Sequence, residues 1–431
     1  MKSFFIILLF LTYISNVYAN NFTNSTNDNE RIFFDTYLGI DILTLFLVFF
    51  ISIITTIGGV GGGGLLIPTY MLVSKFSLEE AIPLSVVTIL GDTLVRIIVL
   101  YNKKHPLNEK RYLIDMMPIL LIVPFDGNSS FIGVILSEIF PQSFTIILII
   151  LVLGFTFYKS ISKAIRSFLK ENIYLNEETN NLEMVMIDGI AEYFNAEQVR
   201  EARQNNLGEG DTLNDKLIKT GIIFLSILII SIFSITRSLI DKCSLYYWIH
   251  IVSQFFIVGI IGFLIIKYLA NDYEKKRQNN YIFLEGDIIW KKENITKFIL
   301  IATVTGALST YMGIGGGMLI TPIMMQVGMI PEVVVATSSI TTFFSSTIST
   351  INYILVGKLL INYGLLYSFV SALGSIFGLI LSNIILTKFK RQSIIIFIVS
   401  LILFTSIILL VTNGLTNYNF YRFKFNNFCE M

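Results

Sequence analysis

Apolar blocks of about 20 residues recur along the whole chain, and they constrain its fold more than any other feature. Such a block is long enough to cross the hydrocarbon core of a bilayer, which is ~30 Å thick. Only 14% of the residues are charged and 54% are hydrophobic, whereas a soluble domain carries about 25% charged residues. The sequence therefore predicts an all-α polytopic membrane protein. The blocks lie near residues 39–57, 58–75, 81–101, 113–137, 143–158, 217–236, 247–266, 297–311, 312–329, 333–357, 363–386 and 393–412.

The N-terminus is typical of a protein that enters the secretory pathway. Residues 1–19 read as a signal peptide, with a basic start, an apolar core and a small-x-small end. An uncleaved anchor helix is the alternative. Two N-x-Thr sequons begin at Asn21 and Asn24, and their glycosylation would place segment 20–37 in the lumen or outside the cell.

Lysines and arginines in short loops predict which face of the protein is cytosolic. The loops around 138–142 and 359–362 have none and are expected outside. With a lumenal N-terminus, twelve spans satisfy these assignments, and so do eight spans plus two re-entrant hairpins, at 39–75 and 297–329. The basic residues expected in the cytosol are Lys103, Lys104, Lys110, Arg111, Lys159, Lys163, Arg166, Lys170, Lys267, Lys275, Lys276, Arg277, Lys291, Lys292, Lys388, Lys390 and Arg391.

The remaining polar segments indicate little about function. Residues 166–216 form an acidic cytosolic loop, in which 187–204 either makes an amphipathic helix or, as we favour, stays solvated. The only two cysteines, Cys243 and Cys429, are too few for a disulfide framework; we interpret them as unpaired thiols, with one disulfide between them as the alternative. A net charge of +1 gives no reason to expect nucleic-acid binding.

One apolar block contains an unusual run of glycines. GGVGGGGLLIP, from Gly58 to Pro68, has six glycines in seven positions. Each glycine costs a helix interior about 1 kcal/mol relative to alanine, so this run is expected to break the helix. A second copy, GIGGGMLITP, runs from Gly313 to Pro322 and aligns with the first after a shift of 254 residues.

The two glycine runs divide the chain into two similar halves. Residues 38–165 and 297–413 each begin with a glycine-broken segment and continue with a hydroxyl-bearing span and two more spans. Between them lie a helix pair at 217–270 and a cytosolic loop at 271–296, and a tail follows at 414–431. The first half begins outside and the second in the cytosol, so the repeats are predicted to be inverted. Inverted repeats with broken helices are typical of secondary transporters.

Several motifs in this order resemble the TauE/SafE family of membrane transporters, also called the toluene sulfonate uptake permease family. The chain is most similar to the plant and protist branch. The motifs are Gly58 to Pro68, Leu84-Ser85 with Tyr101-Asn102-Lys103-Lys104-His105-Pro106, Phe140-Pro141 with Lys163-Ala164, Cys243-Ser244-Leu245-Tyr246-Tyr247-Trp248, and Gly313 to Gly317 with Ala336 to Ser346.

The resemblance implies export or uptake of a small sulfur-containing anion such as sulfite, sulfoacetate or an organosulfonate. It does not fix the substrate. The chain departs from the branch at Asp92, Arg96, Asp126 and Asn128, where relatives have small or apolar residues. Because of these departures, the substrate and the coupling ion are not carried over from the family to this chain.

A helix that begins inside the membrane presents unpaired backbone N–H groups and a partial positive charge. Such an end can bind an anion without a lysine, and two inverted copies would bring two ends together. The alternative is that the glycines permit close helix packing. Hydroxyl groups can also donate to an anion, and we include those that enter the next span just after each glycine hairpin. The predicted substrate-binding residues are Gly59, Gly61, Gly62, Gly63, Gly64, Ser85, Thr88, Gly313, Gly315, Gly316, Gly317, Thr337 and Ser338.

Three charged residues lie inside spans and are candidates for coupling or gating. Asp92 and Arg96 are four apart, so they share a helical face as a gate or as a structural ion pair. Asp126 has no residue of opposite charge in its span, and we expect it to couple transport to protons. The sequence contains no metal-ligand cluster, Walker motif or nucleophile with a histidine partner, so we expect neither an enzyme nor a cofactor.

Three functions remain open at this stage. The favoured hypothesis is a secondary transporter whose partners are a small anion, the bilayer and protons. An anion channel would share the glycine site. A trafficking or receptor role in the endomembrane system is the third hypothesis.

Overall fold

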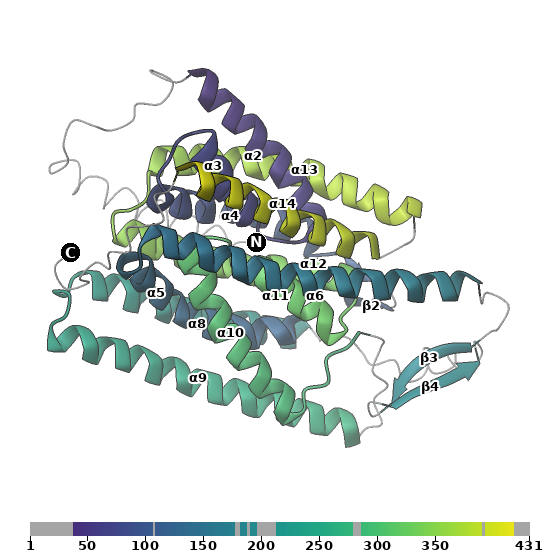
Figure 1. Ribbon diagram of the computed structural model, residues 1–431. Coiled ribbons are helices and arrows are strands. Elements are labelled where there is room, and N and C mark those ends of the chain that lie inside the picture. The colour runs from purple at the N-terminus through teal and green to yellow at the C-terminus, as the bar shows by residue number, and fades with distance from the viewer. Residues whose placement is uncertain are drawn as a thin grey trace.

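The computed structural model describes residues 38–106, 108–176, 182–187, 190–195, 213–278, 286–389 and 393–417. The predicted signal peptide, Asn21 and Asn24 lie outside these residues. Within the described part, twelve helices and two small β-hairpins follow one another (Figure 1). The helices are α2 (Leu38–Gly58), α3 (Gly63–Leu72), α4 (Leu78–Leu100), α5 (Met116–Ile139), α6 (Gln142–Asn176), α8 (Leu213–Ser238), α9 (Leu245–Gln278), α10 (Lys292–Met312), α11 (Gly316–Val327), α12 (Pro331–Leu355), α13 (Ile361–Phe389) and α14 (Ser393–Asn417).

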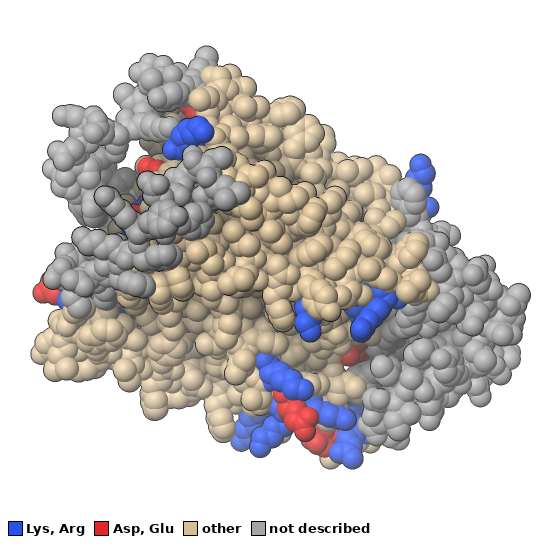
Figure 2. Space-filling view, viewed as in Figure 1, with Lys and Arg blue, Asp and Glu red and all other residues tan. Residues whose placement is uncertain are grey.

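The helices confirm an all-α polytopic membrane protein. Ten of those described are long and apolar enough to cross a bilayer, and only α3 and α11 are shorter. The central helix α12 is buried along its entire candidate span, whereas α9 leaves most of its side chains at the surface. Figure 2 shows a broad uncharged band, with most visible lysines and arginines towards the end where β3 and β4 lie in Figure 1. An apolar belt of this kind is what a bilayer requires.

Each short helix turns back beside the long helix before it. The hydroxyl of Ser74, just after α3, lies 2.8 Å from that of Thr44 in the first turns of α2. In the second half, a Cβ added at Gly286, before α10, would lie 3.0 Å from the backbone nitrogen of Ile330, after α11. Both glycine-broken segments are therefore hairpins whose two ends lie on one face, as both the twelve-span and the eight-span alternatives require.

The two halves pack as related copies. Helix α2 packs on α13 as α10 packs on α5, and α4 packs on α13 as α12 packs on α5. Likewise α3 contacts α14 and α11 contacts α6, while the pairs α4–α12 and α6–α14 meet across the middle. These pairs map onto one another when the halves are exchanged, as expected for a two-fold relation between repeats.

The halves run in opposite directions. Gln142 at the start of α6 bonds to Glu79 at the start of α4, and this end, near the start of α2, is called the Glu79 face. Arg111 forms an ion pair at 2.9 Å with Asp287, shortly before α10, and this end is called the Arg111 face. Because α2 begins near the Glu79 face and α10 near the Arg111 face, the repeats are inverted.

The polar segments differ from the sequence predictions. Strands β1 (Lys104–His105) and β2 (Asn108–Tyr112) form a hairpin after α4. Helix α6 continues to Asn176, and the acidic segment then forms the antiparallel strands β3 (Leu182–Ile187) and β4 (Ile190–Asn195). The predicted alternative of an amphipathic helix over 187–204 is wrong at residues 190–195, because these residues form strand β4 and pair with β3.

The interpretation of the cysteines as unpaired thiols is also wrong. Cys243, in the turn between α8 and α9, is disulfide-bonded. The only other cysteine in the chain, Cys429, lies outside the described residues.

Candidate functional site

Two short glycine turns separate the helices of the two hairpins. In turn 1, Gly59 and Gly62 have φ of 67° and 58°, and α3 begins at Gly63. In turn 2, Gly313 and Gly315 have φ of 66° and 74°, and α11 begins at Gly316. Positive φ is costly for residues that have a Cβ. The glycines therefore break the helices where the sequence predicts.

The two turns lie against each other in the centre of the protein. A Cβ added at Gly61 would lie 3.6 Å from the Cα of Gly315, and one added at Gly317 would lie 3.3 Å from the nitrogen of Gly61. Turn 1 also reaches Ser338, seven residues into α12 or about 10 Å along that helix. The hairpins enter from opposite faces and overlap, which brings the N-termini of α3 and α11 together.

The glycines permit this overlap because no side chain fits between the turns. A Cβ at Gly63 would collide with the carbonyl oxygen of Gly313, and one at Gly317 with the hydroxyl of Thr342. A Cβ at Gly59 would lie 2.7 Å from the Cα of Val335. Close packing, the alternative reading of the glycine runs, is therefore present in this structure. Anion binding by the same glycines stays a prediction.

Hydroxyl groups from each half bond to the turn of the other half. Ser85 of α4 donates to the carbonyl of Gly313 at 2.6 Å. Ser338 of α12 donates to the carbonyl of Gly59 at 3.0 Å. The structure thus brings both predicted serines to the glycine turns, but their visible role is to bond to the backbone.

The two predicted threonines face other partners. The hydroxyl of Thr88 lies 2.7 Å from that of Tyr70 on α3, and the ring of Tyr70 stacks on Tyr367. Thr337 accepts a hydrogen bond from the backbone nitrogen of Asp115, at the start of α5. Thr88 therefore lies close to the hairpin of turn 1, whereas Thr337 connects α12 to α5.

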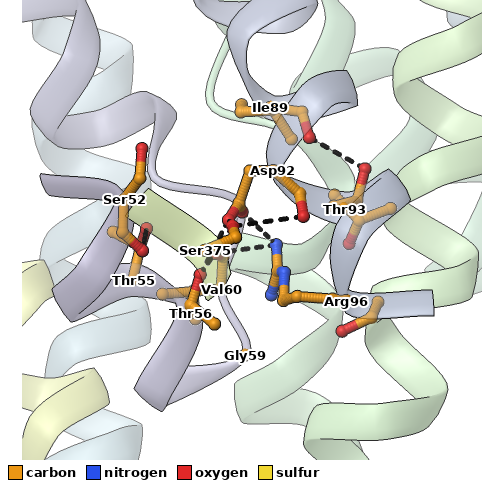
Figure 3. Close-up of polar contacts among 12 residues, drawn as sticks. Ser52, Thr55, Thr56, Gly59, Val60, Ile89, Asp92, Thr93, Arg96 and Ser375 are labelled. Carbon is orange, nitrogen blue, oxygen red and sulfur yellow. Dashed lines mark hydrogen bonds and ion pairs between the residues drawn. The ribbon is translucent and has the colours of Figure 1, made fainter. Parts of the chain in front are cut away.

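Asp92 and Arg96 form a buried ion pair beside turn 1 (Figure 3). The Nη2 of Arg96 lies 2.5 Å from the Oδ2 of Asp92 and 3.5 Å from the carbonyl oxygen of Val60. The other carboxylate oxygen accepts hydrogen bonds from Thr56, at 2.7 Å, and from Ser375. The predicted contact between the two charges is confirmed, and the carboxylate has a full set of donors.

The Arg96 side chain retains unused hydrogen-bonding capacity. It is fully buried, and its Nε and Nη1 atoms have no hydrogen-bond partner among the described residues. A guanidinium has five N–H donors, and these two atoms carry three of them. Leaving charged donors unpaired in a protein interior is costly, so a bound molecule with acceptor oxygens would be stabilised here.

Asp126 lies on the other side of the glycine turns. Its side chain is 2% exposed, accepts a hydrogen bond from Thr305 at 3.5 Å, and lies near the hydroxyl of Ser345. The Ser345 hydroxyl would lie 3.1 Å from a Cβ added at Gly316. The structure therefore places Asp126 one side chain away from turn 2, as Thr56 connects Asp92 to turn 1.

Sequence reasoning missed Thr56, Ser375 and Ser345, which connect the buried carboxylates to the helices around them. Ser375 is far from the glycine runs in the sequence, and nothing in its own span marks it. Thr56 had a signal, because it precedes turn 1 by three residues and aligns with Thr310 before turn 2. No cluster of His, Cys, Asp and Glu that could hold a metal occurs among the described residues.

Comparison with known proteins supports the resemblance seen in the motifs. Residues 217–409 match the family model described as "Sulfite exporter TauE/SafE". The chain is 26% identical to Sulfite exporter TauE/SafE family protein 1 of Arabidopsis thaliana, over 87% of this chain and 84% of that protein. It is 27% identical to proteins 5 and 2 of the same plant, over 85% of this chain and 82% of each.

No solved structure matches the chain. The family model covers most of the second half of the chain, and the similarity to the plant relatives extends into the first half. Together with the inverted helical architecture, these matches show that the chain is similar to TauE/SafE membrane proteins, to the family model over residues 217–409 and to the plant relatives over most of its length.

Proposed function

We propose that the protein is a secondary transporter of a small sulfur-containing anion, such as sulfite or an organosulfonate, and that it works by alternating access between its inverted repeats. The observation that carries this proposal is the buried guanidinium of Arg96, which has unpaired N–H donors beside the first glycine turn. The family model and the plant relatives are named as sulfite exporters, which supports sulfite as the first candidate.

The chemistry of the site suits an oxyanion. Asp92 neutralises Arg96, so the pair can be buried without net charge, while the remaining N–H groups of Arg96 can donate to an incoming anion. The N-termini of α3 and α11 point partial positive charge at the same central region. An anion with several acceptor oxygens can bind to these donors at the same time. Together they replace the hydrogen bonds to water that the anion loses when it enters the buried site.

The contacts between the two turns are consistent with a cycle in which the centre of the protein opens to one face and then to the other. Each turn bonds to the first turns of a helix in the other repeat, through Ser85 and Ser338. Movement of one repeat against the other would separate these contacts on one face at a time and expose the glycine backbone to that face. This movement is what alternating access between inverted repeats requires.

We also propose that Asp126 links transport to protons. Its carboxylate accepts a hydrogen bond from Thr305 and lies near the hydroxyl of Ser345, and the ion pairs of the described residues do not include it. When a buried carboxylate without a cationic partner takes up a proton, its uncompensated charge is removed. In membrane spans such residues mark proton relays. Its connection through Ser345 to turn 2 would let protonation bias the position of that hairpin.

The orientation that we propose has the Glu79 face in the lumen or outside the cell. The predicted signal peptide and sequons support it, and the positive-inside rule is satisfied because Arg111 and the basic last turn of α9 lie on the opposite face. The disulfide at Cys243, on the Glu79 face, adds support because disulfides persist in oxidising compartments. Removing Asn21 and Asn24 singly and together should change the size shift that a glycosidase produces.

Flux in proteoliposomes tests the transport proposal. Purified protein is reconstituted and tested with sulfite, sulfate, thiosulfate and methanesulfonate, with and without a pH gradient. We expect sulfite or methanesulfonate flux that saturates and responds to the gradient. Flux that rises linearly with concentration and ignores the gradient would indicate an anion channel instead, and no flux of any of the four anions would exclude the proposed substrate class.

Variants of the Arg96 pair show whether the flux uses this site. Arg96→Gln alone should abolish saturable flux, but it also leaves Asp92 without its cation. The double variant Asp92→Asn/Arg96→Gln removes both charges at once and keeps hydrogen-bonding groups of similar size. We expect it to reach the membrane and bind the anion poorly. Normal flux in the double variant would place the substrate elsewhere.

A further inference from the structure

A cavity of about 160 Å³ lies at the Glu79 face, away from the glycine turns. It is enclosed by the last turns of α5, α8 and α12 and by the first turn of α9. It therefore lies where the inserted helix pair α8–α9 meets both repeats. A cavity of this size holds about five water molecules, or a molecule of roughly five to eight non-hydrogen atoms.

The cavity has a wall that donates hydrogen bonds. Arg237 lies in it and donates to the side-chain oxygens of Gln254, at 3.1 Å, and Asn352, at 3.3 Å. Its guanidinium also lies over the ring of Phe131, at 4.5 Å. Three helices thus hold Arg237 in place.

Two more polar groups in this wall have unused capacity. The oxygen of Asn352 is turned towards Arg237, and its buried amide nitrogen has no hydrogen-bond partner among the described residues. Within the same part of the chain, the hydroxyl of Ser234, which is 2% exposed, has no partner either. Both residues line the cavity. Buried polar groups normally find partners, so two unpaired groups in one small cavity indicate a ligand that supplies them.

The charges of the lining select an anion. Among the described residues of the lining, Arg237 and Lys242 are cations and Glu138 is the one carboxylate, 3.5 Å from the Nζ of Lys242. The lining therefore has a net charge of +1, from two cations and one anion. The same lining includes the apolar side chains of Val134, Ile135 and Leu355, which are called the apolar wall.

We infer that this cavity is a second ligand site, for a small organic anion with a carboxylate-like head and a short apolar body. The head would accept hydrogen bonds from Arg237, Asn352 and Ser234, and the body would pack against the apolar wall. This inference does not rest on the proposed transport function, because none of the residues belongs to the glycine turns or to the Arg96 pair.

The site also connects to the interior. Gln254, which accepts from Arg237, donates in turn to the side-chain oxygen of Asn128 at 3.0 Å. Asn128 is two residues from Asp126 on α5. Occupation of the cavity would therefore alter hydrogen bonds that lead to the buried carboxylate near turn 2.

Intrinsic fluorescence of the full-length purified protein tests this inference. The chain has two tryptophans, and Trp248 contacts the cavity residue Tyr247, with ring centroids 5.7 Å apart. In a Trp290→Phe background Trp248 is the sole reporter. Titration with butyrate should give a saturable change in its emission, whereas butyramide, which has nearly the same shape and no charge, should give none.

Two variants in that background assign the response to the cavity. Arg237→Gln should weaken butyrate binding about tenfold to 100-fold, because it removes a charged hydrogen bond. Asn352→Asp replaces a donor by a carboxylate but keeps an acceptor for Arg237, so it should fold and repel butyrate. Thr236→Val, on α8 but outside the cavity, is the matched control and should bind normally.

Three outcomes would overturn the inference: an equal response to butyrate and butyramide, no response to either, or native affinity in Asn352→Asp. The transport proposal is unaffected by all three, since it is tested by sulfite flux and at Arg96.

Discussion

The two glycine turns have nearly the same backbone and very different surroundings. Gly59 and Gly313 have φ of 67° and 66°, and the carbonyl of each accepts a hydrogen bond from a serine of the other repeat. Around turn 1, however, a complete ion pair is buried, whereas the carboxylate near turn 2 bonds to a hydroxyl.

The 254-residue shift shows where the symmetry ends. It relates Asp92 to Ser346 and Arg96 to Thr350, so the second repeat has hydroxyls where the first has charges. Backbone symmetry is required for the hairpins to overlap, because each turn is the packing partner of the other. The charges are under no such requirement. The difference suggests that the fold uses both turns alike, while substrate and coupling chemistry are divided between them.

The largest difference between the turns should be found at Arg96. Arg96→Gln leaves the buried Asp92 without its cation, which costs about 3–5 kcal/mol in folding free energy. Thr350→Val, at the related position, removes a buried hydroxyl that has no partner among the described residues, and we expect a change below about 1 kcal/mol. Unfolding titrated with SDS in mixed micelles measures both. Equal losses would mean that the charges at turn 1 are not what separates the two repeats.

The glycines themselves should show the symmetry. An alanine at Gly59 or Gly313 must adopt positive φ, which costs about 1–2 kcal/mol, and must displace Val335 or Ile82, which costs about 1–3 kcal/mol more. The two variants should therefore lose similar stability, about 2–5 kcal/mol each, in the same titration.

A glycine outside the turns provides the control for these variants. Gly154→Ala in α6 has nothing within 4 Å of the added Cβ and should gain up to about 1 kcal/mol. A loss confined to one of the two turns would contradict the symmetry of the backbone.

This symmetry was visible in the sequence, and the chemistry around it was visible only in part. The spacing of glycines and prolines predicts both breaks, and charge counting predicts the inverted repeats, because both are local properties of the chain. The contact of Asp92 with Arg96 follows from helical spacing. The donors from Thr56 and Ser375 do not, because they come from helices whose packing no local pattern encodes.

Two errors have similar causes. The period of a short apolar-polar segment cannot by itself separate a helix from a hairpin such as β3–β4. A disulfide depends on where the chain brings Cys243 in space rather than on the number of cysteines.

A smaller difference concerns proton coupling at turn 2. Asp126→Asn keeps the acceptor oxygen for Thr305 but cannot take up a proton. We expect flux driven by a pH gradient to fall to the rate measured without a gradient, while exchange of anion against anion continues. Asp92→Asn/Arg96→Gln should instead reduce both processes. If Asp126→Asn kept its response to the gradient, the division of roles between the two turns would be wrong.

The smallest expected effect separates the two serines that bond to the turns. The carbonyl of Gly59 accepts from Ser338 and also from Thr321, at 3.1 Å. The only side-chain donor recorded for the carbonyl of Gly313 among the described residues is Ser85. Ser85→Ala should therefore leave that carbonyl without its side-chain donor and cost about 1–3 kcal/mol, whereas Ser338→Ala should cost about 1 kcal/mol or less.

Both serine variants are read by the same SDS titration, and the double variant Thr321→Val/Ser338→Ala extends the test. Removal of both donors to Gly59 should bring its cost up to that of Ser85→Ala. If the double variant were no less stable than Ser338→Ala, the hydroxyls would not hold turn 1 in place. The two hairpins would then be fixed by contact between their glycines alone, and the overlap of the turns would not need the serines that each repeat extends to the other.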